Sequence, residues 1–366
     1  MKHILILANN DIGLYSFRRE LIMKLLKQYK VTICVPYGPR VEDLTALGCK
    51  FVDIQLDRRG LNPFKDIKLL FRYWVIFNNE KPDIVLTYTI KPNVYGGFIS
   101  ALKNIPYIVN ITGLGAAFEN RGIVKLIATL LYKISMRKCS CIFFQNIDTK
   151  NRLLPLLRHD TYHEIIPGSG VNTNDFEFSE YPDKRECIVF NYVGRIMKIK
   201  GIEEFLFCSK EIKREYPYVT FNVIGAIDDL QYEAIIRKYD KLKIINYLGQ
   251  QSDMKSFIRD SNAVIHASHS EGMSNVLLEH CSMGRPCIAP NIPGCKEIVE
   301  HGINGFLFTV CDSQDMLKKI KDFINIDYST MALMGLEARK KVEICFDRDI
   351  IIDAYLAAID RALTSD

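Results

Sequence analysis

The stretch HILILANNDIGLYSFRRELIMKLLKQYKVTICVP (His3–Pro36) decides the fold class. A short apolar run comes first, a segment with apolar residues at helical spacing follows, and a second apolar run ends at a proline. Parallel strands need a long crossover connection, which is usually a helix, so this order is typical of a parallel sheet. The sequence therefore predicts an α/β protein.

The same alternation continues along the chain and predicts two series of strands. A polar stretch at 172–186 has several turn formers and little periodicity, so we interpret it as the link between two domains. We expect two Rossmann-like domains, each a doubly wound parallel sheet, at 1–172 and 173–345, facing a cleft, with a C-terminal helix at 346–366 that packs back on the first domain. The predicted strands are 3–8, 31–36, 51–56, 83–88, 106–111, 141–146, 163–171, 187–194, 219–225, 242–249, 262–268 and 285–290.

Composition is that of an ordinary folded protein. Of the 366 residues, 48% are hydrophobic and 25% are charged, and no repeat has solenoid spacing. The 11 cysteines include no CxxC pair, which fits reduced thiols in a cytosol. The opening apolar run is too short for a signal peptide, and no run of about 18 apolar residues predicts a membrane-spanning helix.

The net charge of +5 is unevenly distributed, because residues 1–180 carry +8 and the remainder −3. A basic half can bind nucleic acid, anionic lipid or a phosphorylated ligand. The predicted strands carry no basic-aromatic platform and the chain has no groove-reading motif, so we expect no nucleic-acid partner.

Two cations flank one predicted loop in the stretch GRIMKIKG (Gly194–Gly201). Arg195 follows the end of a predicted strand, and Lys200 precedes a predicted helix. Arginine as a fork and lysine as a point charge can clamp a diphosphate, with the helix start adding partial positive charge. A basic surface loop would show the same short pattern, so the neighbouring motifs must decide.

The stretch SEGMSNVLLEHCSMGRP (Ser270–Pro286) places Glu271 at a strand tip and Glu279 inside the following helix. Ser274 is the expected N-cap, and the amides of Met273, Ser274 and Asn275 are expected to point at an anion. Carboxylates accept hydrogen bonds from vicinal hydroxyl groups, as on a ribose or hexose. The pattern therefore predicts a ligand with phosphate in the middle and hydroxyls at both ends.

GRIMKIKG followed by EGMSNVLLE resembles the family 4 retaining glycosyltransferases of the GT-B fold. Further segments extend the resemblance to bacterial O-antigen and capsule transferases, among them α-1,3-N-acetylgalactosaminyl enzymes: NNDIGLYSFRRELI, RRGLNPFKDIKLL, KPDIVLTYTIKPNVYGG, NITGLGAAF and NIPGCKEIVEHGINGFLF. The first domain would then bind the acceptor and the second the nucleotide sugar.

The resemblance implies roles for individual residues in donor binding and catalysis. Arg195 and Lys200 would bind the nucleotide diphosphate and act as catalytic cations, Glu279 would bind the ribose, and Glu271 would face the transferred sugar as the catalytic carboxylate. Gly13 would let backbone amides approach the donor phosphate. The chain has one glycine in that loop where many members have two, and NITGLG where some members have a histidine.

The resemblance also implies a reaction and its partners. We expect a UDP-sugar donor, with N-acetylgalactosamine as the best guess, and an undecaprenyl-diphosphate-linked saccharide acceptor. Lys91, Asn93 and Thr112 are candidate acceptor-binding residues. No metal or cofactor is expected, since Arg195 and Lys200 would neutralise the leaving diphosphate. Asp347 and Asp349 are interpreted as capping residues, and the histidines near the glutamates as structural.

Two basic segments of the first domain, at 58–74 and 121–138, interleave apolar and cationic residues. Such a segment can lie on an anionic lipid surface, although ordinary surface helices show the same pattern. We therefore expect a cytoplasmic enzyme that binds peripherally to the inner face of the cytoplasmic membrane. Two alternatives stay open: a UDP-sugar 2-epimerase of the same fold, and a catalytically silent sugar-nucleotide-binding scaffold subunit.

Overall fold

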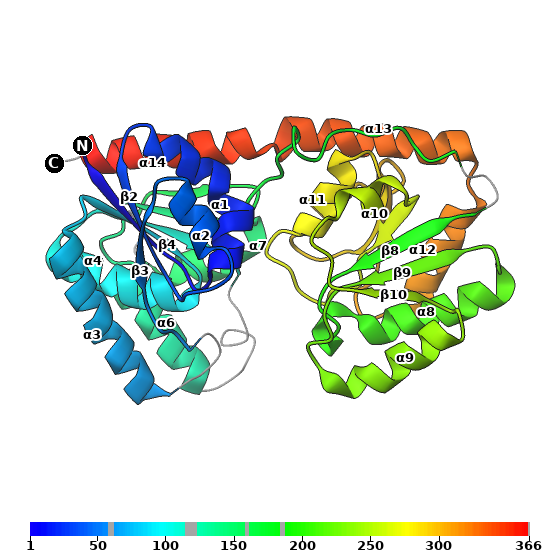
Figure 1. Cartoon of the computed structure of the whole chain (residues 1–366), viewed down its shortest axis with the longest axis horizontal. Coiled ribbons are helices and arrows are strands. Elements are labelled where there is room, and N and C mark those ends of the chain that lie inside the picture. Colours follow the sequence, from blue (N-terminus) through cyan, green and yellow to red (C-terminus); the bar gives the residue numbers. More distant parts are fainter. Residues whose placement is uncertain (58–61, 114–122, 158–160, 184–186, 365–366) are drawn as a thin grey trace. The chain divides into compact units, whose positions relative to one another are not determined.

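The computed structural model describes residues 1–57, 62–113, 123–157, 161–183 and 187–364, with the side chains of 123–125 excepted. The chain divides into two compact units (Figure 1). Unit 1 comprises Met1–Ser169 and Ile351–Asp366, and unit 2 comprises Gly170–Ile350. The first segment of unit 1 ends three residues before the domain boundary expected at 172. Unit 2 ends five residues after the boundary expected at 345.

Unit 1 is built on a seven-stranded sheet with the order β3-β2-β1-β4-β5-β6-β7, and every neighbouring pair is parallel. Its central strands are buried on both faces, which explains their continuous apolar sequences. The strands are β1 (His3–Leu7), β2 (Lys30–Val35), β3 (Lys50–Asp53), β4 (Ile84–Tyr88), β5 (Tyr107–Ile111), β6 (Cys141–Phe144) and β7 (His163–Ile165).

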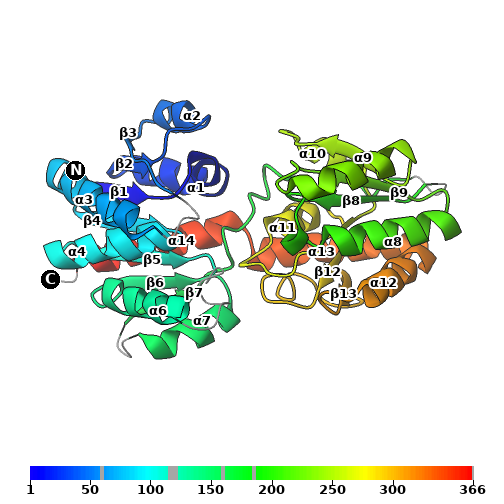
Figure 2. The ribbon, with the colours of Figure 1, turned by 90° about the horizontal axis from the view of Figure 1, so that it is seen from below.

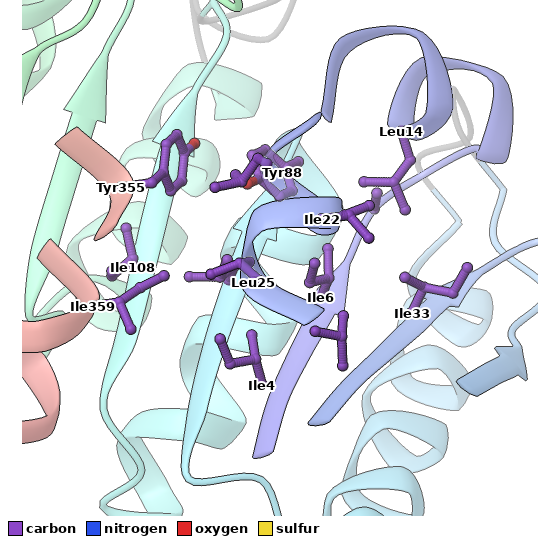
Figure 3. Close-up of a cluster of buried hydrophobic side chains, with 14 of the residues drawn as sticks. Ile4, Ile6, Leu14, Ile22, Leu25, Ile33, Tyr88, Ile108, Tyr355 and Ile359 are labelled. Carbon is purple, nitrogen blue, oxygen red and sulfur yellow. The ribbon is translucent and has the colours of Figure 1, made fainter. Parts of the chain in front are cut away.

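Helices cover both faces of this sheet. On one face, side chains of α1, α2 and α14 pack against Ile4, Ile6 and Ile108, and Figure 3 shows Tyr355 and Ile359 of α14 in the same cluster. The C-terminal helix therefore belongs to the core of unit 1. Helices α3, α4, α6 and α7 cover the other face. The bounds are α1 (Asp11–Leu26), α2 (Val41–Ala46), α3 (Pro63–Glu80), α4 (Gly97–Lys103), α6 (Ile123–Ser135), α7 (Ile147–Leu153) and α14 (Arg348–Thr364).

Unit 2 repeats the same topology with six parallel strands in the order β10-β9-β8-β11-β12-β13. Two parallel, Rossmann-like sheets are confirmed. The last strand was not predicted, because its four residues follow turn formers and give too short an apolar run. The strands are β8 (Val189–Val193), β9 (Thr220–Ile224), β10 (Asn246–Gly249), β11 (Ala263–Ile265), β12 (Cys287–Pro290) and β13 (Gly305–Phe308).

The helices of unit 2 also form two layers. Side chains of α8, α9 and α12 fill one core, and α8 lies beside α12 (Figure 2). Side chains of α11 and α13 fill the core on the other face. The bounds are α8 (Ile202–Glu215), α9 (Glu233–Lys241), α10 (Lys255–Arg259), α11 (Asn275–Ser282), α12 (Ser313–Asn325) and α13 (Tyr328–Cys345). Across the described part of the chain, no helix combines the length and apolar character that crossing a membrane requires.

A fully buried arginine holds the segment before β8 to the rest of unit 2. The guanidinium of Arg285 donates to six backbone carbonyls and one hydroxyl, and burial lowers its pKa to about 10. Its partners are the carbonyls of Ser179, Glu180, Ile258, Arg259, Met283 and Gly284 and the Ser179 hydroxyl. The five donors of one guanidinium therefore satisfy backbone groups that have little access to water.

Replacing this guanidinium should destabilise unit 2. We expect Arg285→Met to lower the free energy of unfolding by at least about 3 kcal/mol, because several buried carbonyls lose their donors. Urea unfolding curves measure this change. Arg214→Met is the control, since Arg214 is exposed and forms a surface ion pair with Glu211, and we expect a change within about 0.5 kcal/mol. Equal effects of the two substitutions would contradict the role given to Arg285.

Candidate functional site

The candidate site of unit 2 lies where the strand order reverses. β8 is hydrogen-bonded to β9 on one side and to β11 on the other, so the loops after β8 and β11 diverge from a switch point. Ligands of open α/β sheets bind beyond the carboxyl ends of the strands at such a point. The loop after β8 contains Arg195 and Lys200, and the loop after β11 contains Glu271.

The loop after β8 is held in place by backbone contacts. A short 3-10 helix, Lys198–Lys200, ends at Gly201, whose φ is +69°. A Cβ at position 201 would lie 2.0 Å from the carbonyl oxygen of Ala267, so only glycine allows this approach. The carbonyl of Lys200 accepts a hydrogen bond of 3.0 Å from the Tyr192 hydroxyl. These contacts hold the backbone of Lys200 beside the end of β11.

The side chains of Lys200, His266 and Glu271 meet in this place. Lys200 Nζ lies 2.6 Å from Glu271 Oε1, and His266 Nε2 lies 3.1 Å from the same oxygen. Lys200 Nζ is also 3.5 Å from the hydroxyl of Ser268. His266 is buried and was expected to be structural, but its ring contacts the proposed catalytic carboxylate. The sequence signal that could have indicated this contact is a polar residue, His266, near the end of the apolar run NAVIHAS.

These partners keep Glu271 ionised. Burial raises the pKa of a carboxyl, but the hydrogen bond from His266, its positive charge when protonated and the charge of Lys200 outweigh burial and lower the pKa of Glu271 to about 2. Glu271 is therefore a fixed negative charge at neutral pH, suited to stabilising a developing positive charge.

Arg195 is the more exposed of the two predicted cations. Its side chain is 49% exposed, and Nη1 lies 3.1 Å from Asp228 Oδ2 at the surface. An exposed ion pair of this kind contributes little to stability, so exchanging Asp228 for another anion costs little. The guanidinium can therefore turn toward a phosphate without disturbing the core.

Helix α11 begins as the sequence predicted. Ser274 is the N-cap, and its hydroxyl accepts a hydrogen bond of 3.4 Å from the Leu277 amide and lies 3.3 Å from His266 Nε2. The prediction that the amide of Ser274 points at an anion was wrong, because this amide donates to the carbonyl of Gly294 at 3.0 Å. Met273 is buried and Asn275 is partly exposed at the helix start.

Glu279 has an environment opposite to that of Glu271. Burial raises the pKa of Glu279 to about 7, and the negative charge of Asp175 adds to this effect while Arg348 opposes it. The carboxyl therefore exchanges its proton near neutral pH. Hydroxyl donors on a bound ribose would favour its ionised form.

The predicted residues of unit 1 are mostly engaged in internal contacts. Gly13 lies in the first turn of α1 instead of a loop, and its amide donates to the Asn10 side chain at 2.5 Å. The approach of neighbouring backbone amides to a donor phosphate stays a prediction. Lys91 follows β4 and its Nζ lies 2.6 Å from Asp66. The buried Asn93 side chain donates to the Asn110 carbonyl at 2.8 Å, and Thr112 is partly exposed just after β5.

The remaining sequence predictions concern Asp347, His280 and the two basic segments. Asp347 accepts the Asp349 amide at 2.8 Å, so its capping role at the start of α14 is confirmed. His280 is fully buried and its Nδ1 lies 2.7 Å from the Val276 carbonyl, which is a structural contact. The two basic segments fall partly on 58–61 and 121–122, which lie outside the described residues.

Two family models match the chain. Residues 3–146 match the model described as glycosyl transferase 4-like, and residues 173–341 match the model described as glycosyl transferases group 1. The two matches fall on unit 1 and unit 2, and the second contains all the candidate residues around Glu271.

Several of the similar proteins are bacterial glycosyltransferases. An N,N'-diacetylbacillosaminyl-diphospho-undecaprenol alpha-1,3-N-acetylgalactosaminyltransferase of Campylobacter jejuni is 24% identical over 98% of both chains. A UDP-Gal:alpha-D-GlcNAc-diphosphoundecaprenol alpha-1,3-galactosyltransferase of Escherichia coli is 28% identical over 78% of this chain and 76% of that protein. The structure of Anabaena HepE in complex with UDP and glucose matches 98% of this chain and 100% of its own, with a TM-score of 0.80 and 17% identity, and the fold is therefore GT-B.

The raised pKa of Glu279 should make stability depend on pH. Its pKa is about 7 in the fold and about 4.3 in an unfolded chain, so the folded state binds more protons between these values and loses stability as pH rises through that window. We expect Glu279→Gln to stabilise the protein by up to about 3 kcal/mol at pH 8 and to change little at pH 4. Thermal unfolding at both pH values measures this difference, and an equal shift at both would contradict it.

Proposed function

This chain is a glycosyltransferase with a 4-like domain followed by a group 1 domain, and we propose that it transfers a sugar, with retention, from a UDP-sugar to an undecaprenyl-diphosphate-linked saccharide. The observation that carries this proposal is the cluster of Lys200, His266 and Glu271 at the switch point of unit 2. The names of the Campylobacter and Escherichia relatives support the lipid-linked acceptor, and N-acetylgalactosamine, the sugar in the Campylobacter enzyme's name, is our best guess for the donor.

The donor would extend across the edge of the unit 2 sheet. Arg195 and Lys200 would bind the diphosphate, with the amides of Met273 and Asn275 at the start of α11 adding to the anion site. Glu279 would accept hydrogen bonds from the ribose, and Glu271 would face the sugar. Two glutamates eight positions apart would thus bind opposite ends of one ligand.

The reaction needs opposite charges at its two ends. As the bond between the anomeric carbon and the phosphate oxygen breaks, positive charge develops on the sugar and negative charge on the phosphate. Glu271 would stabilise the first, and Lys200 and Arg195 the second. The acceptor hydroxyl would bond to the anomeric carbon on the face that the phosphate leaves, and its proton would go to the departing phosphate oxygen. A covalent intermediate on Glu271 is the less favoured route.

Helix α3 of unit 1 offers a place for the acceptor. A pocket of about 360 Å³ lies between α3 and the residues after β3. Lys65, Lys68 and Arg72 line it and repeat at helical spacing, so they form one basic stripe. Arg72 donates to the carbonyl of Gln55 at 3.3 Å, which leaves other donors of its fork for a phosphate. We propose that the acceptor diphosphate binds in this pocket.

A neighbouring stripe of α3 is apolar and exposed. Phe64 is 81% exposed, and Ile67 and Phe71 are about two-thirds exposed. Helix α6 adds Leu126, Leu130 and others, while Lys133 and Arg137 are exposed near its end. Apolar side chains beside cations fit the surface of an anionic membrane. We propose that unit 1 binds the inner face of the cytoplasmic membrane, where its acceptor is anchored.

Transfer can be tested with purified protein, radiolabelled UDP-sugars and a lipid-diphosphate-linked acceptor. We expect Glu271→Gln to lower kcat at least about a hundredfold and UDP affinity less than about tenfold, because the carboxylate faces the sugar. Lys200→Ala should lower kcat and also weaken the affinity for UDP. Glu337→Gln is the matched control, since Glu337 forms a surface ion pair with Lys340 in unit 2. No transfer from any donor, or full turnover in Glu271→Gln and Lys200→Ala, would overturn the proposal.

The same assay separates the two alternatives. A 2-epimerase would convert the UDP-sugar without an acceptor, and the contact between His266 and Glu271 is the feature that such an enzyme could use. A scaffold subunit would bind UDP and release no product.

Membrane binding is tested with vesicles. We expect Phe64→Ser combined with Phe71→Ser to reduce partitioning into phosphatidylglycerol vesicles at least about tenfold, because each phenylalanine contributes about 1.5 to 3 kcal/mol when buried. Leu333→Ser combined with Leu336→Ser is the control, since both leucines are exposed on α13 of unit 2. An equal loss of partitioning in both double variants would contradict the proposed membrane-binding surface. Partitioning that does not depend on the anionic lipid content would also contradict it.

A further inference from the structure

Three side chains next to the donor site have no role in the proposed transfer. Glu204 lies in the first turn of α8, His269 follows β11, and Cys311 lies in the turn between β13 and α12. One ligand atom from each, a carboxylate oxygen, an imidazole nitrogen and a thiol sulfur, lies within 4.8 Å of the other two. Three different elements thus bring three metal-binding groups together.

Among the residues that the structure describes, the two oxygens of Glu204 differ, because one has a hydrogen-bond partner and the other has none. His269 Nε2 lies 2.9 Å from Glu204 Oε1. The other oxygen, Glu204 Oε2, is buried and, among the residues that the structure describes, has no hydrogen-bond partner. A buried carboxylate oxygen without a donor is costly, so its persistence indicates a partner that is neither backbone nor side chain.

We propose that Glu204, His269 and Cys311 bind one divalent cation of the zinc class. A thiolate with an imidazole and a carboxylate is a donor set that zinc prefers over magnesium or calcium. Three protein ligands leave a fourth position for water. With a thiolate and a carboxylate bound, the charge of the ion is balanced.

The geometry needs only a small adjustment. In a tetrahedral site with bonds of about 2.0 to 2.3 Å, ligand atoms lie about 3.3 to 3.6 Å apart. The nitrogen and oxygen at 2.9 Å must separate slightly, and the sulfur must approach by about 1 Å. Cys311 is exposed, so its side chain can rotate, and the amide of His269 already fixes the loop by donating to the Ile199 carbonyl at 2.9 Å.

The ion would join the two segments that carry the donor-binding residues. Glu204 lies four residues after Lys200, and His269 lies two residues before Glu271. A cation held by both would tether the start of α8 to the loop after β11, independently of the ion pair between Lys200 and Glu271. The site is therefore a stabilising tether for this edge of unit 2 and takes no part in the transfer chemistry.

The test uses the full chain, with Zn²⁺ for calorimetric titration and thermal unfolding and Co²⁺ for absorption spectra. We expect one site, a raised unfolding temperature with Zn²⁺, and a thiolate-to-cobalt charge-transfer band. Cys311→Ser should remove the band and weaken Zn²⁺ binding at least about tenfold, and Glu204→Gln should weaken binding to a similar extent. Cys345→Ser is the control, because Cys345 is the other cysteine that is exposed.

Three results would overturn the site: no thiolate band with Co²⁺, unchanged affinity in Cys311→Ser, or loss of binding in Cys345→Ser as well. None of these measurements uses a sugar donor or acceptor. Their failure would therefore leave the proposed glycosyl transfer untouched, and failure of the transfer assay would leave the metal site untouched.

Discussion

The approach of Gly201 to the carbonyl of Ala267 is the constraint on which the candidate site depends. β8 and β11 are hydrogen-bonded neighbours, and their loops would diverge at the switch point without a contact that joins them. A Cβ at position 201 would overlap the carbonyl, so glycine brings Lys200 to the end of β11. A second glycine, Gly294, lies close to the carbonyl of Gly272, where a Cβ would be 2.7 Å from the oxygen, and it holds the start of α11. Backbone contacts therefore fix the loops, and side chains complete the charge pattern.

The two glutamates show how environment gives one residue type two different pKa values. Glu271 is buried beside Lys200 and His266, which lower its pKa to about 2 and keep it charged. Glu279 is buried with weaker compensation, and its pKa rises to about 7. One carboxylate is a permanent charge at neutral pH and the other exchanges a proton near that pH. Of the two, Glu271 contacts Lys200 and His266, so we expect the two carboxyls to have separate roles and not to act as a paired acid and base.

The sequence predicted the sheets and the principal residues of unit 2 because both depend on local signals. Buried parallel strands have continuous apolar runs, and Arg195, Lys200, Glu271 and the Ser274 cap lie at strand ends and a helix start that those runs define. The errors come from long-range contacts. The Ser274 amide donates to the carbonyl of Gly294, twenty residues later. The ion pair of Lys91 with Asp66, twenty-five residues earlier, was likewise not foreseen, and the role of Lys91 in acceptor binding stays a prediction. Gly13 was expected in a loop, but α1 begins at Asp11, so Gly13 lies in the first turn of the helix.

In the proposed function Lys200 would have two anionic partners, Glu271 and the donor diphosphate, which would couple donor binding to catalysis. Its ammonium lies 2.6 Å from Glu271, so a diphosphate bound nearby would compete for the same cation. As Lys200 turns toward the phosphate, Glu271 keeps the hydrogen bond from His266 and stays ionised. The carboxylate would then face the sugar with less of its charge neutralised, at the moment when positive charge develops there. If the donor binds as we propose, the ion pair would neutralise Glu271 at rest, and a bound diphosphate would draw Lys200 away from it.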